Sequence, residues 1–265
     1  MFINKKKSVP TPPYFFLKRS RQENFRSFSS STKLCFAPNE GFTLAEVLIT
    51  LVIIGVIAAI TVPTLITKYQ KEQTITRLKK AYSALAQTTN RAIADYGPIE
   101  TWELGSNNPD DAKIFIEKYI TPYMNILKAP TTYNEGLWNN QLFYLNGSQH
   151  NYDNSYVRFY LNDGTSITSR ISTSNSTHKY IALQIDINGD KKPNKLGKDI
   201  FRYYYIVLHD VQSIQGKFIP DGFITDRNTL LSNSNDAKCN KNQSGNQCAA
   251  VIMMDGWQIK DDYPW

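Results

Sequence analysis

Five oxygen-bearing side chains lie within residues 186–199. They are Asp186, Asn188, Asp190, Asn194 and Asp199. Carboxylate and amide oxygens are the ligands that Ca²⁺ takes in proteins, so this spacing predicts a site for a hard cation. The stretch is not an EF-hand, because Gly189 is in the wrong place and no glutamate closes the loop. Four lysines in the stretch weaken a cation site, and its Gly, Pro, Asn and Asp residues are equally typical of a solvated turn. Both interpretations stay open.

Two of the three cysteines, Cys239 and Cys248, lie close together near the C-terminus in a stretch rich in Gly, Asn and Ser. This pair suits a disulfide if this part of the chain faces an oxidising compartment, and would be two free thiols otherwise. The third, Cys35, lies in a basic segment that begins the sequence.

Glu46 stands directly before a long apolar run. A carboxylate near the centre of a bilayer costs from about 2.5 kcal/mol upward, and less towards the interface. Glutamate also reaches the interface less easily than lysine does. A residue of this kind is usually functional, so we expect Glu46 to have a cationic partner.

Histidines and glycine motifs give no sign of catalysis. His150, His178 and His209 are scattered, with no metal-ligand spacing among them. The sequence contains no phosphate-binding glycine loop and no nucleophile elbow. We therefore predict that the protein is not an enzyme.

The elements that position these residues begin with a charge-free stretch from Val47 to Thr67, which is 21 residues long. At about 1.5 Å per residue this length spans a hydrocarbon core of about 30 Å, so it predicts a membrane helix. Beyond Lys68 the apolar residues recur at steps of three and four up to Tyr96, which extends the helix along a soluble domain. Gly97 and Pro98 end it, and Pro63 is expected to bend it.

The rest of the chain predicts an α+β domain. We expect a helix over residues 110–128, interrupted by Pro122, and a hairpin turn at 162–164. Strands are predicted over residues 141–145, 156–161, 166–171, 180–187, 201–208 and 249–254.

Charge divides the chain at the same junction. Residues 1–41 hold eight basic and two acidic residues, and so carry almost all of the formal net charge of +7. The remainder is nearly neutral, so the basic balance of the whole chain does not predict a nucleic-acid partner.

The junction itself reads Gly41-Phe42-Thr43-Leu44-Ala45-Glu46, followed by about twenty apolar residues. It resembles the prepilin family, the type IV pilins and the pseudopilins of type II secretion, in which a glycine, a phenylalanine and a glutamate hold these positions. Pro63 also matches the family's helix pattern. The resemblance covers about 26 residues closely, and it implies a pilin-like α+β fold with the long helix packed on an antiparallel sheet.

The resemblance also implies how the protein is processed and assembled. A prepilin peptidase would cut between Gly41 and Phe42 on the cytoplasmic side and methylate the new amine of Phe42. Glu46 would then pair with the N-terminal amine of a neighbouring pilin or pseudopilin subunit. The expected further partner is the inner-membrane assembly platform. The protein would cross the inner membrane once, with its C-terminal domain in the periplasm or in an extracellular filament, where an oxidising environment favours the disulfide.

This interpretation divides the chain into a cleaved leader (1–41), a transmembrane helix (42–66), its amphipathic continuation (67–97) and an α+β domain (98–265). The leader is longer than most in the family, which leaves open whether Met1 is the true start. Calcium is the single candidate cofactor. The family's loop of Asp, Asn, Gly and Pro residues resembles residues 186–199, and some members hold calcium there.

Alternatives stay open on the sequence. It does not distinguish a secretion pseudopilus from a motility or competence pilus, nor a major from a minor subunit. A pilin-like adhesin or DNA-uptake receptor is a second hypothesis, supported by one cluster of basic residues: Lys191, Lys192, Lys195, Lys198 and Arg202. A membrane-anchored periplasmic protein of other function is a third.

Overall fold

The computed structural model describes residues 41–132, 142–150, 155–175, 177–234 and 236–265. Apart from Gly41, the leader lies outside the described residues. Contacts group the chain into two units, residues 1–53 and residues 54–265. The first helix crosses the boundary between them, and the sheet and all other elements belong to the second unit.

Helix α1 (Leu44–Tyr96) is 53 residues long and runs through Pro63. Its first half is rich in β-branched residues, which favour strands in water. In lipid, however, a helix is the only single segment that satisfies its own backbone. Threonine hydroxyls in this half also find hydrogen-bond partners within the helix. Those of Thr61 and Thr67 donate to the carbonyls of Ile57 and Pro63, each at 2.9 Å.

The helix ends where the sequence predicts. Gly97 adopts φ +84°, the left-handed conformation that glycine tolerates, and its N–H donates to the Ile93 carbonyl at 2.9 Å. Pro98 follows and has no N–H with which to continue the helix.

Six antiparallel strands form the main sheet, in the order β1-β4-β5-β6-β7-β8. Their bounds are β1 Ile126–Thr132, β4 Val157–Leu161, β5 Ser166–Asn175, β6 His178–Asp186, β7 Ile200–Leu208 and β8 Lys217–Pro220. A small second sheet pairs β2 (Leu142–Phe143) with β3 (Gln149–His150). The fold is therefore α+β and pilin-like, with a long N-terminal helix on a mostly antiparallel sheet, as predicted.

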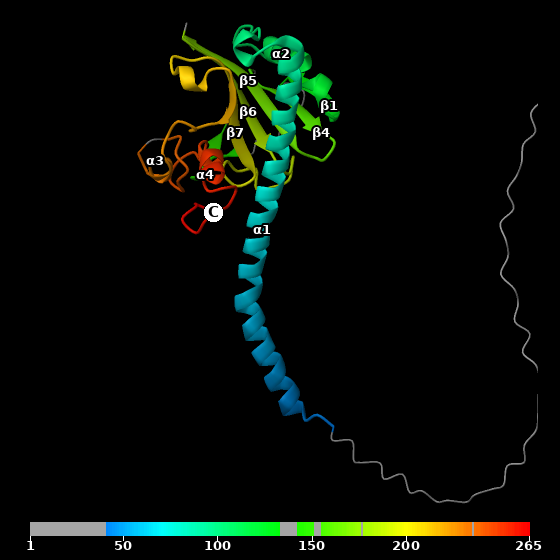
Figure 1. Ribbon diagram of the computed structural model, residues 1–265. Coiled ribbons are helices and arrows are strands. Elements are labelled where there is room, and N and C mark those ends of the chain that lie inside the picture. The colour runs from blue at the N-terminus through cyan, green and yellow to red at the C-terminus, as the bar shows by residue number, and fades with distance from the viewer. Residues whose placement is uncertain (1–40, 133–141, 151–154, 176, 235) are drawn as a thin grey trace, which may run out of the picture. The chain divides into compact units, whose positions relative to one another are not determined.

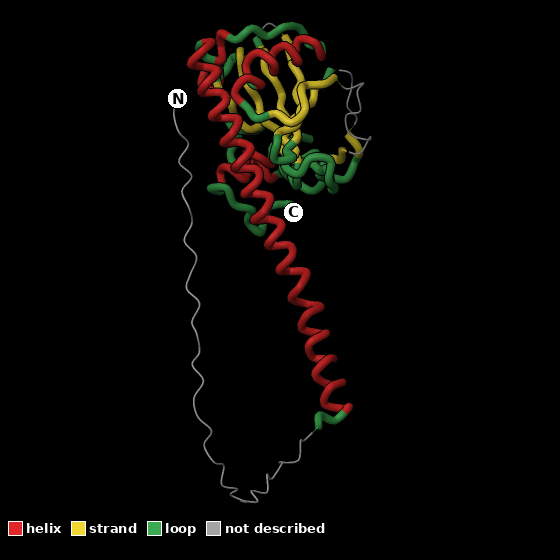
Figure 2. The backbone as a smooth tube through the Cα atoms, turned by 90° about the vertical axis from the view of Figure 1, so that its right-hand side faces the viewer, coloured by secondary structure: helices red, strands yellow, loops and turns green. Residues whose placement is uncertain are grey.

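The second half of α1 covers one face of the main sheet, and the two views show helix and strands as separate layers (Figures 1 and 2). Leu78 and Leu85 are fully buried and belong to the same core cluster as Ile181 and Leu183 of β6. Tyr82 packs its ring against those of Tyr203, Phe218 and Trp257, at centroid distances of 5.6, 5.5 and 5.2 Å.

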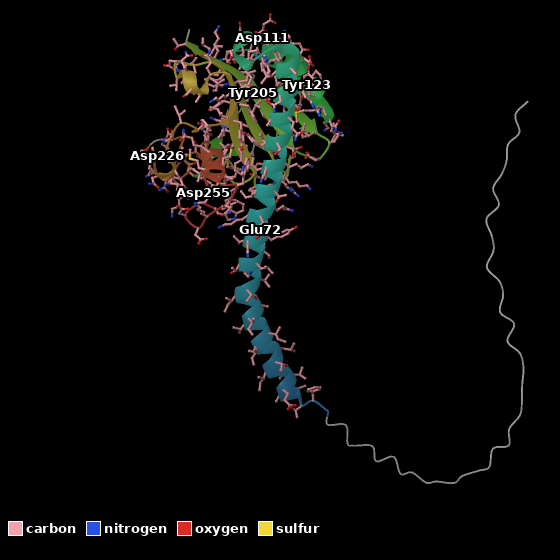
Figure 3. All side chains as sticks on the ribbon, in the orientation of Figure 1. Glu72, Asp111, Tyr123, Tyr205, Asp226 and Asp255 are labelled. Carbon is pink, nitrogen blue, oxygen red and sulfur yellow. A yellow bond between two sulfur atoms is a disulfide. The ribbon has the colours of Figure 1, made fainter. Side chains whose placement is uncertain are left out.

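A polar contact also joins the two layers. The Thr89 hydroxyl lies 2.8 Å from that of Tyr205 in β7, which Figure 3 labels. Both groups are buried, so this bond fixes the helix at one position along the sheet.

Short helices close the ends of the domain. They are η1 (Ile99–Thr101), α2 (Pro109–Tyr119), η2 (Thr121–Tyr123), η4 (Gln212–Ile214), α3 (Arg227–Leu231) and α4 (Cys248–Met254). Asn108 caps α2 by accepting from the Asp111 amide at 2.8 Å, and Asp226 caps α3 in the same way from Thr229 at 3.0 Å (Figure 3).

Two predictions of secondary structure are wrong. Residues 249–254 form helix α4 rather than a strand, because the buried residues 249–252 are apolar on every side and have no period that separates a helix from a strand. The helix predicted over residues 110–128 ends at Tyr119, since Pro122 cannot continue it, and the chain then forms β1. Gln141, the start of one predicted strand, lies outside the described residues.

Candidate functional site

Gly41 and Phe42 precede α1, and both are exposed, Phe42 by 88%. A Cβ atom added to Gly41 would meet nothing within 4 Å. Among the described residues, the fold therefore gives no reason for a glycine at position 41. A glycine with no structural role of its own is expected where another molecule approaches the backbone closely.

Glu46 has a partner within its own chain. Its Oε2 accepts hydrogen bonds from the Thr43 amide and hydroxyl, both at 2.8 Å, and the Glu46 amide donates to Thr43 Oγ1 at 3.2 Å. This reciprocal arrangement is a capping box, in which a threonine and the glutamate three residues later satisfy amides at the helix start. The spacing of Thr43 and Glu46 was readable in the sequence, although the partner predicted for Glu46 was a cation.

The first half of α1 exposes an unbroken apolar surface. Every large apolar side chain from Val47 to Ile66 is at least 43% exposed. The most apolar window of the helix has a mean hydropathy of 2.6, and none of it is buried. This helix is long and apolar enough to cross a membrane, and a surface of this extent in water would be an aggregation hazard. Together with the residues at its start, it describes a single-pass membrane anchor.

The predicted cation loop follows β6 and returns to β7. The Asp199 carboxylate, which is buried, accepts from Asn188 Nδ2 at 3.1 Å and from the Asn194 and Lys195 amides at 2.8 and 2.6 Å. The Asn188 amide donates to Asp186 Oδ1 at 3.1 Å. Four of the five predicted ligands thus belong to one hydrogen-bonded cluster.

Within the described residues, three buried oxygens of this cluster have no hydrogen-bond partner: Asp186 Oδ2, Asn188 Oδ1 and Asn194 Oδ1. Burial, and then the charge of Asp199, raise the pKa of Asp186 to about 8. Burial also raises the pKa of Asp199, although three donors oppose it. Unpaired buried oxygens are costly, and a hard cation would satisfy them. The residues present therefore fit Ca²⁺.

Asp190, the fifth predicted ligand, makes different contacts. Its Oδ1 accepts from Nη2 of the fully buried Arg158 at 2.7 Å, and the Tyr160 hydroxyl donates to its Oδ2 at 3.1 Å. Its carboxylate is thus engaged by an arginine that reading the loop alone would not reveal.

Cys239 and Cys248, the pair favoured by the sequence, form a disulfide with an S–S distance of 2.00 Å. The bridge touches the cation loop, since a Cβ atom at Gly197 would lie 2.8 Å from Cys248 Sγ. The Gly197 carbonyl also accepts from the buried Tyr263 hydroxyl at 2.5 Å. The cation loop, the disulfide and the C-terminal tail (residues 255–265) are therefore packed together.

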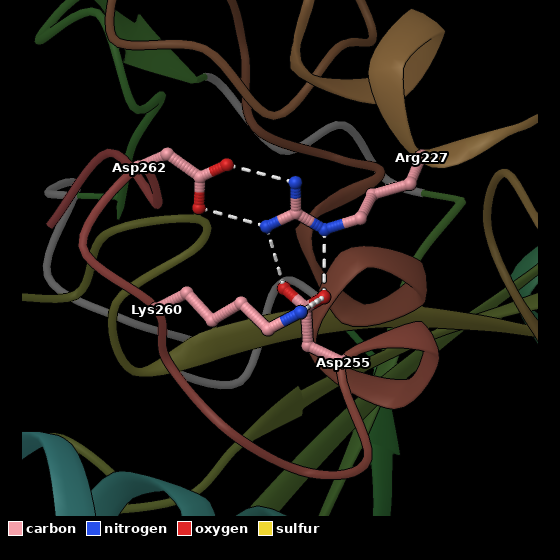
Figure 4. Close-up of polar contacts among 4 residues, drawn as sticks. All are labelled: Arg227, Asp255, Lys260 and Asp262. Atoms are coloured by element: carbon pink, nitrogen blue, oxygen red, sulfur yellow. Dashed lines mark hydrogen bonds and ion pairs between the residues drawn. The ribbon is translucent and has the colours of Figure 1, made fainter.

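Arg227 makes a second set of contacts with the C-terminal tail (Figure 4). Its guanidinium donates two bonds to Asp255, at 2.6 and 2.8 Å, and two to Asp262, both at 2.7 Å. Lys260 Nζ lies 2.7 Å from Asp255 Oδ1, and the Asp255 side chain is only 1% exposed. Burial alone would raise the pKa of Asp255, but its bonds from Arg227 and Lys260 hold it below its usual value. Arg227 likewise lowers the pKa of Asp262.

One cluster was missed by sequence reasoning. His178 and His209, 31 positions apart, lie together with their ring centroids 4.5 Å apart, and Asp210 contacts both. Spacing along the chain could not show this, because the pairing of β6 with β7 brings the two histidines together. His150 lies elsewhere, in β3.

Comparisons with known proteins divide the chain at the membrane helix. Residues 64–265 match the model of a family of unknown function, DUF6613. Residues 37–62 match the prokaryotic N-terminal methylation motif, and this match spans Gly41, Phe42 and Glu46. No curated protein and no solved structure matches the chain.

Proposed function

Since the chain belongs to the family of unknown function DUF6613 and carries the prokaryotic N-terminal methylation motif of type IV pilin-like proteins, we propose that it is a pseudopilin or minor pilin. It would be a structural subunit of a type II secretion pseudopilus or of a type IV pilus. The motif supports processing by a prepilin peptidase, and the proposed role is structural rather than enzymatic.

The division of α1 carries the proposal. One continuous helix has a first half whose apolar side chains are all exposed and a second half whose Leu78 and Leu85 are fully buried under the domain. A simple membrane anchor needs only a span of about 20 residues. An apolar helix built into the domain suits a subunit that leaves the bilayer and exchanges lipid contacts for contacts with neighbouring helices.

Each residue of the junction has a role in this proposal. Gly41, unexplained by the fold, would let the extended backbone enter the active site of the peptidase on the cytoplasmic side. The cut would leave Phe42 as the methylated N-terminus. Glu46 would then pair with the amine of a neighbouring subunit, with the C-terminal domain in the periplasm or in the filament.

A processing assay tests the proposal. Co-expression with a prepilin peptidase should shorten the full chain by residues 1–41, measured by mass spectrometry of the membrane fraction. Gly41→Leu should block the cut. Gly55→Ala is the matched control, because a Cβ atom at Gly55 also meets nothing within 4 Å, and this variant should be processed normally. An unchanged mass of the wild-type chain would contradict the proposal.

Calcium binding at residues 186–199 is a second part of the proposal, supported by the unpaired oxygens of Asp186, Asn188 and Asn194. Asp199 would hold these residues in place through its bonds to Asn188 and Asn194. The ion would supply positive charge to buried oxygens and so stiffen the loop against which the C-terminal tail packs.

Calorimetry and thermal unfolding of the full chain in detergent test this part. Calcium should bind and raise the Tm of the wild type, and EDTA should reverse the rise. Asp186→Asn should lose the effect, whereas Asp163→Asn, in the hairpin turn, should retain it. No calcium uptake, with a Tm indifferent to EDTA, would show that the loop is only a turn.

The DNA-receptor alternative gains nothing from the structure. Lys191 and Lys192 are exposed, whereas Arg202 is half-buried in β7 beside Tyr204. Lys198 lies over the Trp265 ring, with Nζ 5.6 Å from its centroid. The predicted basic cluster is therefore divided, and DNA binding is not part of the proposal.

A further inference from the structure

Two histidines and an aspartate converge at one end of β6 and β7. The pairing of Lys179 with Leu208 places His178, at the start of β6, opposite His209, which follows β7. His178 Nε2 and His209 Nδ1 lie 2.7 and 3.0 Å from the same oxygen, Asp210 Oδ1. One ligand atom from each of the three residues lies within 4.8 Å of the others.

Hydrogen bonds to the two imidazole rings indicate which of their nitrogens carry lone pairs. The Val211 amide donates to His209 Nδ1 at 2.9 Å, so this nitrogen carries a lone pair and has no proton to offer Asp210. His178 Nδ1 lies 3.0 Å from the Thr177 hydroxyl, which can orient the ring so that Nε2 faces Asp210. His178 Nε2, His209 Nδ1 and Asp210 Oδ1 therefore converge, with one proton on His178 Nε2 between that nitrogen and the carboxylate.

A cation would resolve this arrangement. We propose that His178, His209 and Asp210 form a site for a divalent transition metal ion of the zinc class. Two imidazole nitrogens and one carboxylate are the ligands that such ions take when a fourth position stays open. The ion would displace the proton from His178 and replace the Val211 amide at His209.

Around Asp210, the geometry needs only a small adjustment. Ligand atoms around tetrahedral zinc, bonded at about 2.0–2.1 Å, lie about 3.3 Å apart. The present separations of 2.7 and 3.0 Å would open by a few tenths of an ångström. The Asp210 side chain is 61% exposed and is free of the packing that would prevent this movement.

An entry path exists at the same place. His178 and His209 line a cleft of about 480 Å³ together with Tyr180, Tyr204 and Ile206. Their side chains are 25% and 19% exposed, so they reach the solvent while their rings stay positioned. The open fourth position would take water or a donor group from a molecule in this cleft.

This site is separate from the proposed calcium loop. His178 begins β6 and Asp186 ends it, so eight steps of about 3.3 Å per residue separate the two sites. The ligand chemistry differs as well, since the loop offers only oxygen atoms, which zinc-class ions do not prefer over imidazole.

Titration calorimetry of the full chain in detergent tests the proposal, with ZnCl₂ added in excess CaCl₂ so that the loop is saturated. We expect one Zn²⁺ per chain. His178→Gln and His209→Gln should each weaken binding at least about tenfold. His150→Gln is the matched control and should bind as the wild type does. Asp210→Asn changes an exposed side chain, so its loss of binding cannot be ascribed to misfolding.

Cobalt gives an independent readout. Co²⁺ bound by the wild type should show visible absorption bands of a low-symmetry site, and these bands should be absent from His178→Gln and Asp210→Asn. Absence of saturable zinc uptake by the wild type would overturn the proposal. Equal affinity in His178→Gln and the wild type, or equal weakening in His150→Gln, would overturn it too.

Discussion

Asp255 takes a carboxylate into the interior with Arg227 and Lys260 as its partners, and its side chain is only 1% exposed. Such pairs add little net stability when complete, but removal of one partner leaves a buried charge uncompensated. Loss of the four bonds of Arg227 would leave the buried Asp255 with Lys260 as its one remaining cation and would release Asp262.

We expect Arg227→Ala to lower the free energy of unfolding by about 2–4 kcal/mol, a little less than for a pair with no second cation because Lys260 remains. Urea unfolding of the full chain in detergent, followed by tryptophan fluorescence, measures this. Lys118→Ala is the control. It breaks an exposed pair with Glu103 and should change the free energy of unfolding much less than Arg227→Ala does. Equal losses in the two variants would contradict a special role for Arg227.

Acid should weaken the same contacts. The pKa values of Asp255 and Asp262 are lower in the folded protein than their usual values. The folded state then binds fewer protons than the unfolded state, so this stabilisation is complete above the usual aspartate pKa of about 4 and is lost as the pH falls below it. The urea midpoints of the wild type and Asp262→Asn should therefore differ at pH 7, and the difference should shrink as the pH falls below about 4. A difference that stays the same from pH 7 to pH 3 would refute this account.

The two halves of helix α1 have different surroundings. Leu85 is fully buried on the sheet, whereas Leu65, in the apolar half, is 69% exposed. We expect Leu85→Ala to destabilise the domain by about 2–5 kcal/mol, because it leaves a cavity in the core. Leu65→Ala makes the same chemical change outside the domain and should leave urea unfolding in detergent unaltered. A comparable loss from Leu65→Ala would mean that the two halves are not energetically distinct.

Periodicity explains which elements could be predicted. Strands β4 to β7 and the second half of α1 follow patterns that identify them from the sequence, and the first half of α1 is identified by the length of its charge-free run. Helix α4 could not be, because residues 248–252 are all buried and offer no polar face. Strand β1 was missed because it lies at the sheet edge, contains Pro130 and exposes Leu127 by 62%.

The candidate sites also differ in how far they could be predicted, depending on whether their residues are close together in the sequence. Gly41, Phe42 and Glu46 lie within six consecutive residues, so their pattern can be recognised from the sequence alone. The loop of residues 186–199 is also local, but the contact of Asp190 with Arg158 depends on a residue 32 positions away. The pairing of His178 with His209 depends on strand register, which no local pattern specifies.

At the scale of the whole molecule, the C-terminal tail joins several parts of the domain. Tyr263 bonds to Gly197 in the cation loop, Asp262 bonds to Arg227 in α3, and Trp257 packs on Tyr82 of α1. The disulfide Cys239–Cys248 lies beneath the same loop. These contacts link the loop to the tail, and the tail through Trp257 to helix α1.

Glu46 connects the single subunit to the proposed filament, and two substitutions separate its contributions. In the structure its carboxylate serves the capping box with Thr43, which lies wholly on the C-terminal side of the proposed cut. Glu46→Gln keeps an oxygen that can accept from the Thr43 amide but removes the charge. Glu46→Ala removes both. If Glu46 pairs with the N-terminal amine of a neighbour, both variants should be processed but absent from sheared filaments.

Immunoblots of membrane and filament fractions measure this outcome, with Thr43→Val as the matched variant. That change removes the hydroxyl from the capping box and leaves the charge of Glu46 in place, so processing and assembly should both persist. Incorporation of Glu46→Gln at the wild-type level would show that helix capping, and not charge pairing, is what assembly requires of this residue. The charge is expected to decide, because an amine and a carboxylate that meet among apolar helices offset each other's desolvation, which a neutral amide cannot do.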